Sequence, residues 1–463
     1  MRDYQLKIEP FEYVALQNVE IHKGLNCHAD AKISIRIKDD RKEEYLSILA
    51  ADTWLKVTAE GETGTSAVLF YGIVTGFAMG QDGYETILRL EAKSGTVLMD
   101  DKEHYRVFQN KDTICSLLFH KITDTYKEGK VNYVEGESDR TEGVLMQYRE
   151  TDWEFLKRLA SLHNRYIVSD ALQKGCCYTV GLKEGIEQNR KSPDITLALD
   201  ACEYQQKVRN GVKDLQMTDM LTLSVTDREI YQLGDFMIYE GGKYYIYDIR
   251  TRYIGAECVH EYRLKRKEGL QTLPAQHQGI AGCSFEAEVT GVQKDTVQID
   301  IEGDEWKAFD GKKWFAYATV YSSPDGTGWY SMPEVGDNVR LYVLDEENRC
   351  LVVSSVHKET DAARQNPDYK SFKTKYGKEI LFTPDSILMT NNQGMMVEMN
   401  DKEGITVTSD KDILIQAEEN MTIASGSASL LIAAEDIVQV RQGGTTMTLS
   451  DDIYFTGGEF RIQ

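Results

Sequence analysis

The chain has 463 residues, of which 41% are hydrophobic and 28% charged, and its formal net charge at pH 7 is −22. This is the balance of a globular protein of roughly three domains, and so acidic a surface disfavours nucleic acid and anionic membrane lipids as partners. The longest apolar runs, Ala67–Tyr71 and Leu430–Ala434, are five residues long, whereas a membrane span needs roughly 18 or more. We therefore expect a folded protein with no nucleic-acid partner and no stable membrane association.

The N-terminal segment MRDYQLKIEP alternates charged and apolar residues. It lacks the apolar core of a secretory signal peptide, so we expect a chain without one. The eight cysteines are scattered and form no CxxC pair. In a chain without an export signal, such cysteines are expected to be buried thiols.

Short alternating patterns dominate the first 270 residues and predict β-strands. In Lys32–Lys38 (KISIRIK) the three isoleucines fall on one face of a strand. Val68–Thr75 and Thr86–Ala92 repeat the pattern on either side of a turn at Gly80–Gly83, and Lys243–Asp248 (KYYIYD) predicts a later strand.

Two stretches within about residues 110–166 have helical spacing instead. Asp112–Tyr126 carries apolar residues on one face, with Asp112 as the expected capping residue. Thr151–Tyr166 begins with a capping box formed by Thr151 and Glu154, which predicts where that helix starts.

Three further segments follow residue 270. Residues 271–282 are polar, contain glycine and lack periodicity, which is typical of a linker. Residues 283–357 predict a compact unit of about five strands, for which a small Greek-key barrel of the OB-fold type is suitable. Residues 358–377 predict a second, polar connector.

Residues 378–463 contain short apolar cores that recur about every eight residues. These cores begin at Ile405, Ile413, Met421, Leu430, Ile437, Met447 and Ile453. One short strand per repeat is typical of a β-solenoid or β-prism, and strands this short need neighbouring subunits to bury a face. Alternation predicts an inward-facing apolar set: Ile405, Val407, Ile413, Ile415, Met421 and Ile423.

The sequence carries no motif for catalysis, a cofactor or a metal: Walker, GxGxxG, GxSxG, HExxH and EF-hand patterns are all missing. His260-Glu261 lacks the second histidine of a zinc peptidase. Acidic pairs such as Asp451-Asp452 could serve glycoside hydrolysis, although a solvated turn is the simpler interpretation. We expect no catalytic residues, no cofactor and no metal site.

The stretch Gln147–Asn164 (QYRETDWEFLKRLASLHN) resembles a signature of the VgrG family, the spike proteins of type VI secretion systems. The matching residues are Gln147, Glu150, Thr151, Asp152, Trp153, Phe155, Leu156, Arg158 and Leu159. Arg106–Gln109 (RVFQ) and Tyr71–Thr75 (YGIVT) resemble further family segments. In the predicted barrel, the family pattern is matched by Gly328, Trp329, Pro333, Gly336, Asp337 and Val339.

The resemblance implies a mainly β fold with three parts. A phage-hub-like domain of two β-barrel-like modules with a helical insertion would occupy residues 1–270, and the small barrel would follow. The C-terminal repeats at 378–463 would form an intertwined triple-stranded β-helix, a trimeric β-prism. The signature residues are folding devices in this scheme, since they cap a helix and present its aromatic face.

The resemblance also implies a function. The protein would be a homotrimeric central spike that docks on a hexameric tube and on baseplate proteins, with a PAAR-like tip protein as a further partner. Such a spike would be assembled in the bacterial cytoplasm and delivered outside the cell. A phage or tailocin baseplate hub or adhesin, and a secreted cell-wall-binding or cell-wall-degrading β-protein, are the alternatives.

Overall fold

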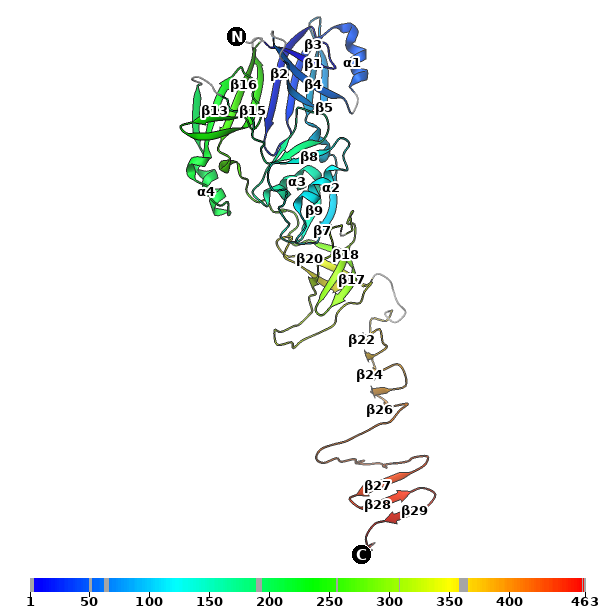
Figure 1. Ribbon diagram of the computed structural model, residues 1–463. Helices are drawn as coiled ribbons and strands as arrows, with labels where there is room; N and C mark the ends of the chain where they lie inside the picture. Colours follow the sequence, from blue (N-terminus) through cyan, green and yellow to red (C-terminus); the bar gives the residue numbers. More distant parts are fainter. Residues whose placement is uncertain are drawn as a thin grey trace. The chain divides into compact units, whose positions relative to one another are not determined.

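A computed structural model describes residues 4–49, 52–61, 66–188, 194–254, 257–307, 309–357, 365–459 and 461 (Figure 1). The chain forms two compact units, Met1–Lys358 and Glu359–Gln463. Each is mainly β, as the sequence predicts. The finer division at residues 270, 283 and 357 stays a prediction.

The first unit contains a large antiparallel sheet with strands drawn from both ends of the region 4–265. Its order is β1-β4-β5-β6-β3-β2-β15-β16-β13-β12, with β14 paired to β15. The bounds are β1 (Tyr4–Glu9), β2 (Ala15–Gly24), β3 (Asp30–Ile37), β4 (Trp54–Gly61), β5 (Ser66–Asp82), β6 (Glu85–Lys93), β12 (Ile195–Leu199), β13 (Leu221–Asp227), β14 (Phe236–Tyr239), β15 (Gly242–Ile254) and β16 (Glu257–Lys265). Short helices lie beside it: η1 (Asp39–Arg41), α1 (Lys42–Ile48), α4 (Ala201–Arg209), η3 (Met217–Met220) and η4 (Glu268–Leu270).

Pairing between β2 and β15 joins the two halves of this sheet, with Gly24 opposite Asp248 and Glu20 opposite Arg252. The predicted alternation holds in β3, where Ile33, Ile35 and Ile37 are all buried. The turn predicted at Gly80–Gly83 begins further along the chain, between Asp82 and Glu85. β5 bends through an irregularity between Val74 and Gly76 and continues to Asp82, so the reversal falls at Gly83.

The residues between the two halves, 95–182, form what we call the helical region. It contains η2 (Gly95–Asp100), β7 (Glu103–Phe108), α2 (Cys115–Thr123), β8 (Lys130–Tyr133), β9 (Leu145–Thr151), α3 (Asp152–Ser161), β10 (Ile167–Ser169) and β11 (Cys177–Val180). β7 pairs with β9, and a second small sheet has the order β10-β11-β8. Both predicted helices are present.

The predicted cap of α2 is wrong. Ile114 is the N-cap residue, with no side-chain hydrogen bond to the helix. The Cys115 N–H at the start of α2 donates instead to the Asp139 carbonyl, 2.7 Å away. The antiparallel bridge between Ile114 and Arg140 brings that carbonyl into place, so the backbone makes a bond that an Asp112 cap would otherwise supply.

The barrel follows at residues 284–355, with strand order β19-β18-β17-β20-β21. Its strands are β17 (Ser284–Gln293), β18 (Thr296–Ile301), β19 (Phe315–Ala316), β20 (Asn338–Val343) and β21 (Cys350–Ser355). A bridge between Tyr317 and Val352 brings the two edges together, and the Ala318 N–H donates to the Val352 carbonyl at 2.8 Å. The five strands therefore nearly close into the predicted small barrel.

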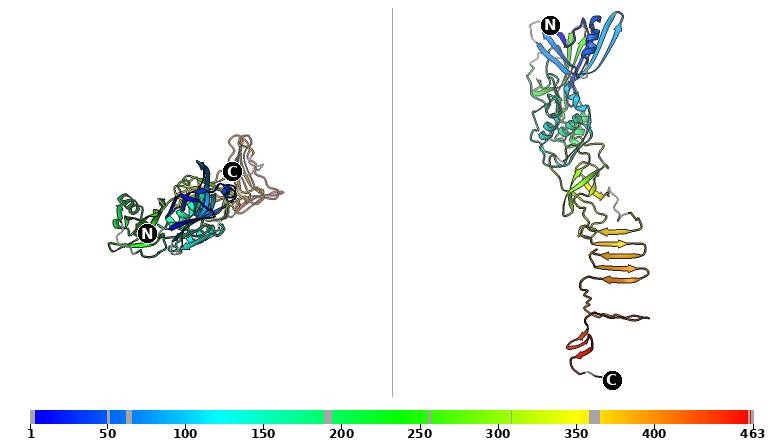
Figure 2. Two further views of the ribbon diagram at one scale, coloured as in Figure 1. Left: turned by 90° about the horizontal axis from the view of Figure 1, so that it is seen from above. Right: turned by 90° about the vertical axis from the view of Figure 1, so that its right-hand side faces the viewer.

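The second unit is a series of short strands in two antiparallel sheets, and the right view of Figure 2 shows the first as a flat ladder. The strands are β22 (Lys370–Lys373), β23 (Glu379–Phe382), β24 (Ser386–Thr390), β25 (Met396–Asn400), β26 (Gly404–Thr408), β27 (Val438–Gln442), β28 (Thr445–Leu449) and β29 (Ile453–Thr456). Residues 358–364 of the predicted connector, and Phe460 and Ile462 of the final repeat, lie outside the described residues.

Three predicted repeat cores, those at Ile413, Met421 and Leu430, form no strand in the single chain. Residues 409–437 run between β26 and β27 without a paired neighbour in either sheet. A strand needs a partner for its N–H and C=O groups, and in the single chain these predicted strands have none.

Candidate functional site

The family-signature residues gather around α3, and a capping box fixes the start of this helix as predicted. The Glu154 N–H donates to Thr151 Oγ1 at 3.2 Å, and the Thr151 N–H donates to Glu154 Oε2 at 3.0 Å. Thr151 Oγ1 in turn donates to Asp100 Oδ1 at 2.5 Å. The cap therefore ties α3 to the end of η2 and sets the direction of its faces.

The apolar face of α3 is buried in the core of the helical region. Trp153, Phe155 and Leu159 are each 1% exposed. The Trp153 ring stacks on His28 at a centroid distance of 4.8 Å, and Phe155 stacks on Phe108 at 5.4 Å. This half of the signature is therefore a packing device.

Arg106, from the RVFQ segment, centres a first buried polar cluster. Its Nη1 donates to Asp152 Oδ1 at 2.6 Å and to Gln147 Oε1 at 3.0 Å. Gln147 Nε2 donates to the same Asp152 oxygen at 2.8 Å, and the Tyr126 hydroxyl donates to Asp152 Oδ2 at 2.7 Å. Asp152 is fully buried and Arg106 nearly so, so the charge of each is compensated by the other.

The same guanidinium reaches into the barrel. Arg106 Nε donates to Glu305 Oε2 at 3.3 Å, and the guanidinium lies 4.1 Å from the centre of the Trp306 ring. His104 Nδ1 lies 2.8 Å from the same Glu305 oxygen. Burial opposes ionisation of Glu305, but the hydrogen bond from His104 and the charge of Arg106 lower its pKa overall.

Arg158, on α3, centres a second cluster. It donates to both oxygens of Glu150, with Nε–Oε1 and Nη2–Oε2 distances of 2.8 Å, and Nη1 donates to Glu347 Oε2 at 2.8 Å. Glu347 lies in the turn between β20 and β21 of the barrel, and its Oε1 accepts from the Met146 N–H at 2.6 Å. Burial raises the pKa of Glu347, and the charge of Arg158 opposes that rise.

A third set of contacts uses Asp310 of the barrel. Its carboxylate accepts from the Gln109 N–H at 3.1 Å, the Asn110 N–H at 3.0 Å and Thr113 Oγ1 at 3.0 Å. In the other direction, Gln109 Nε2 donates to the Ile299 carbonyl of the barrel at 3.2 Å. We call these three sets of contacts between the helical region and the barrel the junction. Most of its contacts are hydrogen bonds in which a charged group takes part.

The predicted barrel residues serve the turn before β20. Pro333 is buried, and Gly336 has φ +96°, a conformation that favours glycine. Asp337 Oδ2 accepts from the Glu334 N–H at 2.9 Å, which closes that turn. Gly328 and Trp329 are exposed and lie outside the junction.

The predicted inward set of the repeats is exposed in the single chain. Exposed fractions run from 47% for Met421 to 74% for Ile405, and Ile413 is 54% exposed. The alternate residues Thr406 and Leu414 are exposed as well, so the inward assignment stays a prediction.

Among the described residues, no group of three or more His, Cys, Asp or Glu side chains is placed to hold a metal ion. His260 is buried with its Nδ1 2.8 Å from Thr251 Oγ1, and burial lowers its pKa to about 4. It is therefore neutral near pH 7.

No helix in the described part of the chain is both long and apolar enough to cross a membrane.

Sequence reasoning missed the barrel's half of the junction: Glu305, Trp306, Asp310 and Glu347. Each lies in a loop or turn beyond the matched motifs. The available signal was indirect. Two arginines within otherwise apolar segments must find acceptors when buried, but nothing local identifies which carboxylates supply them.

Part of the chain matches a known protein family, and its fold is similar to that of several solved structures. Residues 28–165, which include α2 and α3, match the family model of the phage tail baseplate hub (GPD). No curated protein sequence matches the chain. An Escherichia coli component of the type VI secretion system, described as structurally similar to the T4 bacteriophage tail proteins gp27 and gp5, has a TM-score of 0.53 at 14% identity, covering 76% of this chain and 100% of that one.

The Francisella PdpA–VgrG complex gives two further similar structures. The lidded form has a TM-score of 0.57 at 9% identity, covering 85% of this chain and 76% of that one. The half-lidded form has a TM-score of 0.55 at 9% identity and covers 88% of each chain. At these identities the likeness concerns the fold.

Residues 28–165 therefore match the phage tail baseplate hub model, and the fold of the chain is similar to that of the solved type VI secretion component. The fold is also similar to that of the VgrG-containing structures, and the signature residues build the core and the junction described above.

Proposed function

We propose that this VgrG-like protein is the homotrimeric central spike of a contractile injection system, with the first unit as hub and the second as needle. The main support is the surface of the second unit. Many of its large apolar side chains are more than a third exposed, among them Phe372, Phe382, Met389, Ile405, Ile413, Ile415, Leu430, Leu431, Ile432 and Phe455. Soluble monomers rarely expose so much apolar surface, and a trimeric prism would cover it.

Rigidity is the mechanical task in this proposal. As a sheath contracts, axial load would pass from the tube through the hub and barrel into the needle. The junction suits that task because Arg106 and Arg158 hold the barrel by buried, charge-assisted hydrogen bonds. In the needle, backbone ladders and a dry core shared by three chains would resist the same load.

The proposed partners follow from the role. Three hubs, each with two barrel-like modules, would present pseudo-sixfold symmetry to a hexameric tube ring and contact baseplate proteins. A small PAAR-like tip protein would cover the needle end. The particle would assemble in the bacterial cytoplasm and be delivered outward. A tailocin or phage would use the same architecture.

Hub and spike proteins are generally structural and not enzymatic, and we propose no activity for this chain. Peptidoglycan turnover by the purified protein that persists through further purification would contradict that view and favour the cell-wall-degrading alternative.

Light scattering coupled to size exclusion tests the proposal directly. The full chain should have three times the mass of one polypeptide, and deletion of residues 378–463 should weaken or abolish the trimer. A folded full-length monomer at micromolar concentration would refute the spike.

The tip partner has its own test. Co-expression with neighbouring small open reading frames, followed by pull-down, should recover a partner with the full chain and lose it after truncation behind Ser450. Equal capture by both chains would remove the tip protein from the proposal.

A further inference from the structure

The two ends of the barrel differ in what covers them. The end formed by the β18–β19 loop and the β20–β21 turn is covered by the helical region, through Glu305, Asp310 and Glu347 of the junction. The opposite end carries the β17–β18 turn, the start of β20 and the end of β21. The Val356 N–H there donates to the Asn338 carbonyl at 2.7 Å, so the chain leaves the barrel at this opposite end.

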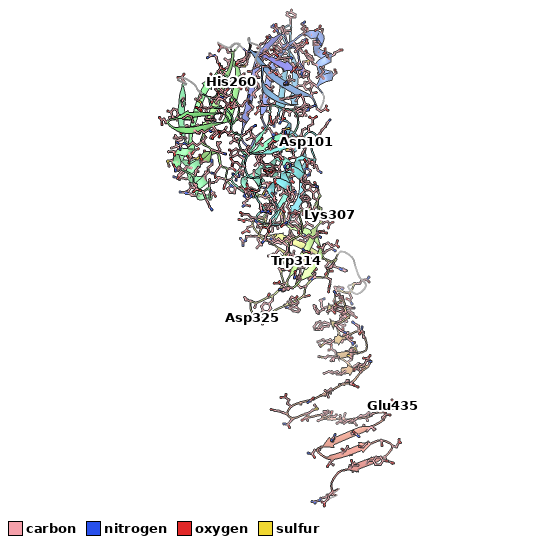
Figure 3. The ribbon with its side chains drawn as sticks, in the orientation of Figure 1. Asp101, His260, Lys307, Trp314, Asp325 and Glu435 are labelled. Atoms are coloured by element: carbon pink, nitrogen blue, oxygen red, sulfur yellow. The ribbon has the colours of Figure 1, made fainter. Side chains whose placement is uncertain are left out.

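A self-contained hairpin projects from that second end, between β19 and β20. Ser322 and Gly328 form an antiparallel bridge, and the Trp329 N–H donates to the Tyr321 carbonyl at 2.8 Å. Asp325, at the hairpin tip, lies on the loop that projects from the barrel, apart from Trp314 (Figure 3). A Cβ atom on Gly328 would lie 2.4 Å from the Tyr321 oxygen, so the hairpin requires glycine there.

The hairpin and the barrel end beside it present an apolar surface. Val320 is 98% exposed, and the others are more than a third exposed: Tyr321, Trp329, Tyr330, Val335 and Val356. The barrel core is complete without them, since Val289, Val297 and Leu341 are fully buried. The Tyr330 hydroxyl donates to the Lys294 carbonyl at 2.9 Å, which fixes the hairpin base and leaves its rings in solvent. A preformed surface of this kind is typical of an interface.

We infer that this surface, which we call the collar, packs against the same barrel end of neighbouring copies of the chain. This inference rests on the proposed trimer. In the trimer, residues 357–369, between Val356 and β22, tether each barrel to one shared needle and span at most ~45 Å when fully extended. Tethering at that range raises the effective concentration of the three barrel ends to roughly the millimolar scale.

The geometry also favours a ring over an isologous pair. The hairpin, with Trp329, and the barrel end, with Val335 and Val356, are distinct parts of one surface. When a hairpin from one copy lies on the barrel end of the next, the contact is heterologous, and three copies close it. The collar would then shield the three barrel ends from solvent.

Site-specific photo-crosslinking in the full-length protein tests this. A benzophenone amino acid at Trp329 should give an interchain product, which peptide mass spectrometry should map to the Val335 or Val356 region of another copy. The same probe at Tyr84, a fully exposed aromatic in the β5–β6 turn, is the matched control and should give none. Light scattering on the same samples reports the trimer separately.

Hydrogen exchange supplies a second measurement. Amides of residues 318–335 should exchange roughly tenfold faster in a Trp329→Ser trimer than in the wild-type trimer, because the variant loses a central aromatic anchor. Tyr84→Ser should leave that segment unchanged.

The outcomes separate the two proposals. A trimer whose Trp329 probe captures no other copy overturns the collar and leaves the spike standing, and so does a trimer whose hairpin instead captures an added saccharide. A monomer overturns both.

Discussion

Gly143 of the helical region packs so closely against Asn348 of the barrel that a Cβ atom on Gly143 would lie 1.6 Å from Asn348 Oδ1. Asn348 is in the same turn as Glu347, the barrel residue bound by Arg158. Close packing and the buried ion pair therefore act at one point of the junction, and each can be tested by substitution.

Gly143→Ala should lower the free energy of unfolding by at most about 1 kcal/mol, because the added methyl displaces only the amide end of the exposed Asn348 side chain. Urea unfolding measures the change. Gly143→Ala with Asn348→Ala should recover most of the loss, since the two sites are coupled. Gly80→Ala, where no atom lies within 4 Å of the added carbon, is the control. A loss that Asn348→Ala leaves uncorrected would contradict the close-packing argument.

Arg158→Met should cost about 3–5 kcal/mol in the same assay, because it leaves the Glu347 and Glu150 carboxylates without their cation in a buried site. Arg349→Met removes the partner of Asp345, a pair whose members are more than half exposed, and should cost no more than about 1 kcal/mol. Equal losses in the two variants would show that the junction does not depend on its buried charges.

A pH dependence should arise where the two halves of the large sheet meet. His22 Nε2 lies 2.7 Å from Asp248 Oδ2, and Nδ1 lies 3.5 Å from Asp30. Hydrogen bonds to these carboxylates raise the pKa of His22 to about 9 from its ordinary 6.5. Because the folded state binds the proton more tightly, the added stability is fully present below about pH 6.5 and is lost as the pH rises through about 9.

His22→Gln isolates this effect. The wild type should exceed the variant by about 1–2 kcal/mol at pH 6, a figure reduced for the one-third exposure of the imidazole, and the gap should close by about pH 10. Thermal unfolding of both proteins across that range measures it. A gap that is constant with pH would mean that His22 contributes by packing and not by charge.

Ile413→Asp tests the needle. Three carboxylates brought together in a dry core should cost at least several kcal/mol, through desolvation and mutual repulsion. The trimer should therefore melt at a lower temperature or dissociate. Leu414→Asp, one residue along and predicted to face outward, is the matched control. Unchanged melting of the Ile413→Asp trimer would show that the inward assignment is wrong.

Local patterns predicted the parts of the fold that local chemistry determines. The capping box of Thr151 and Glu154 and the alternation in β3 are confirmed because adjacent residues satisfy them. The prediction that Asp112 caps α2 was wrong because a distant residue supplies the acceptor. The Asp139 carbonyl, which the fold brings to the start of the helix, accepts the hydrogen bond from the Cys115 N–H.

Long-range contacts account for what the sequence did not predict. Arg158 was predicted as a residue of the family signature, but its acceptor in the barrel, Glu347, lies 189 residues further along the chain. The repeat core at Ile413 forms no strand in the single chain, and its place in a prism shared with other chains stays a prediction. Which carboxylate and which neighbour are involved is a property of the assembled fold.

The pairing of β2 with β15 has a consequence for how the protein must fold. One edge of β2 (residues 15–24) stays unpaired until β15 (residues 242–254) has been synthesised. Most of the first unit must therefore leave the ribosome before the large sheet can be completed. Contacts this distant in sequence slow folding, and an unpaired strand edge invites aggregation meanwhile. Fragments that end before Gly242 should therefore be insoluble, whereas fragments that extend through Lys265 contain every strand of the sheet.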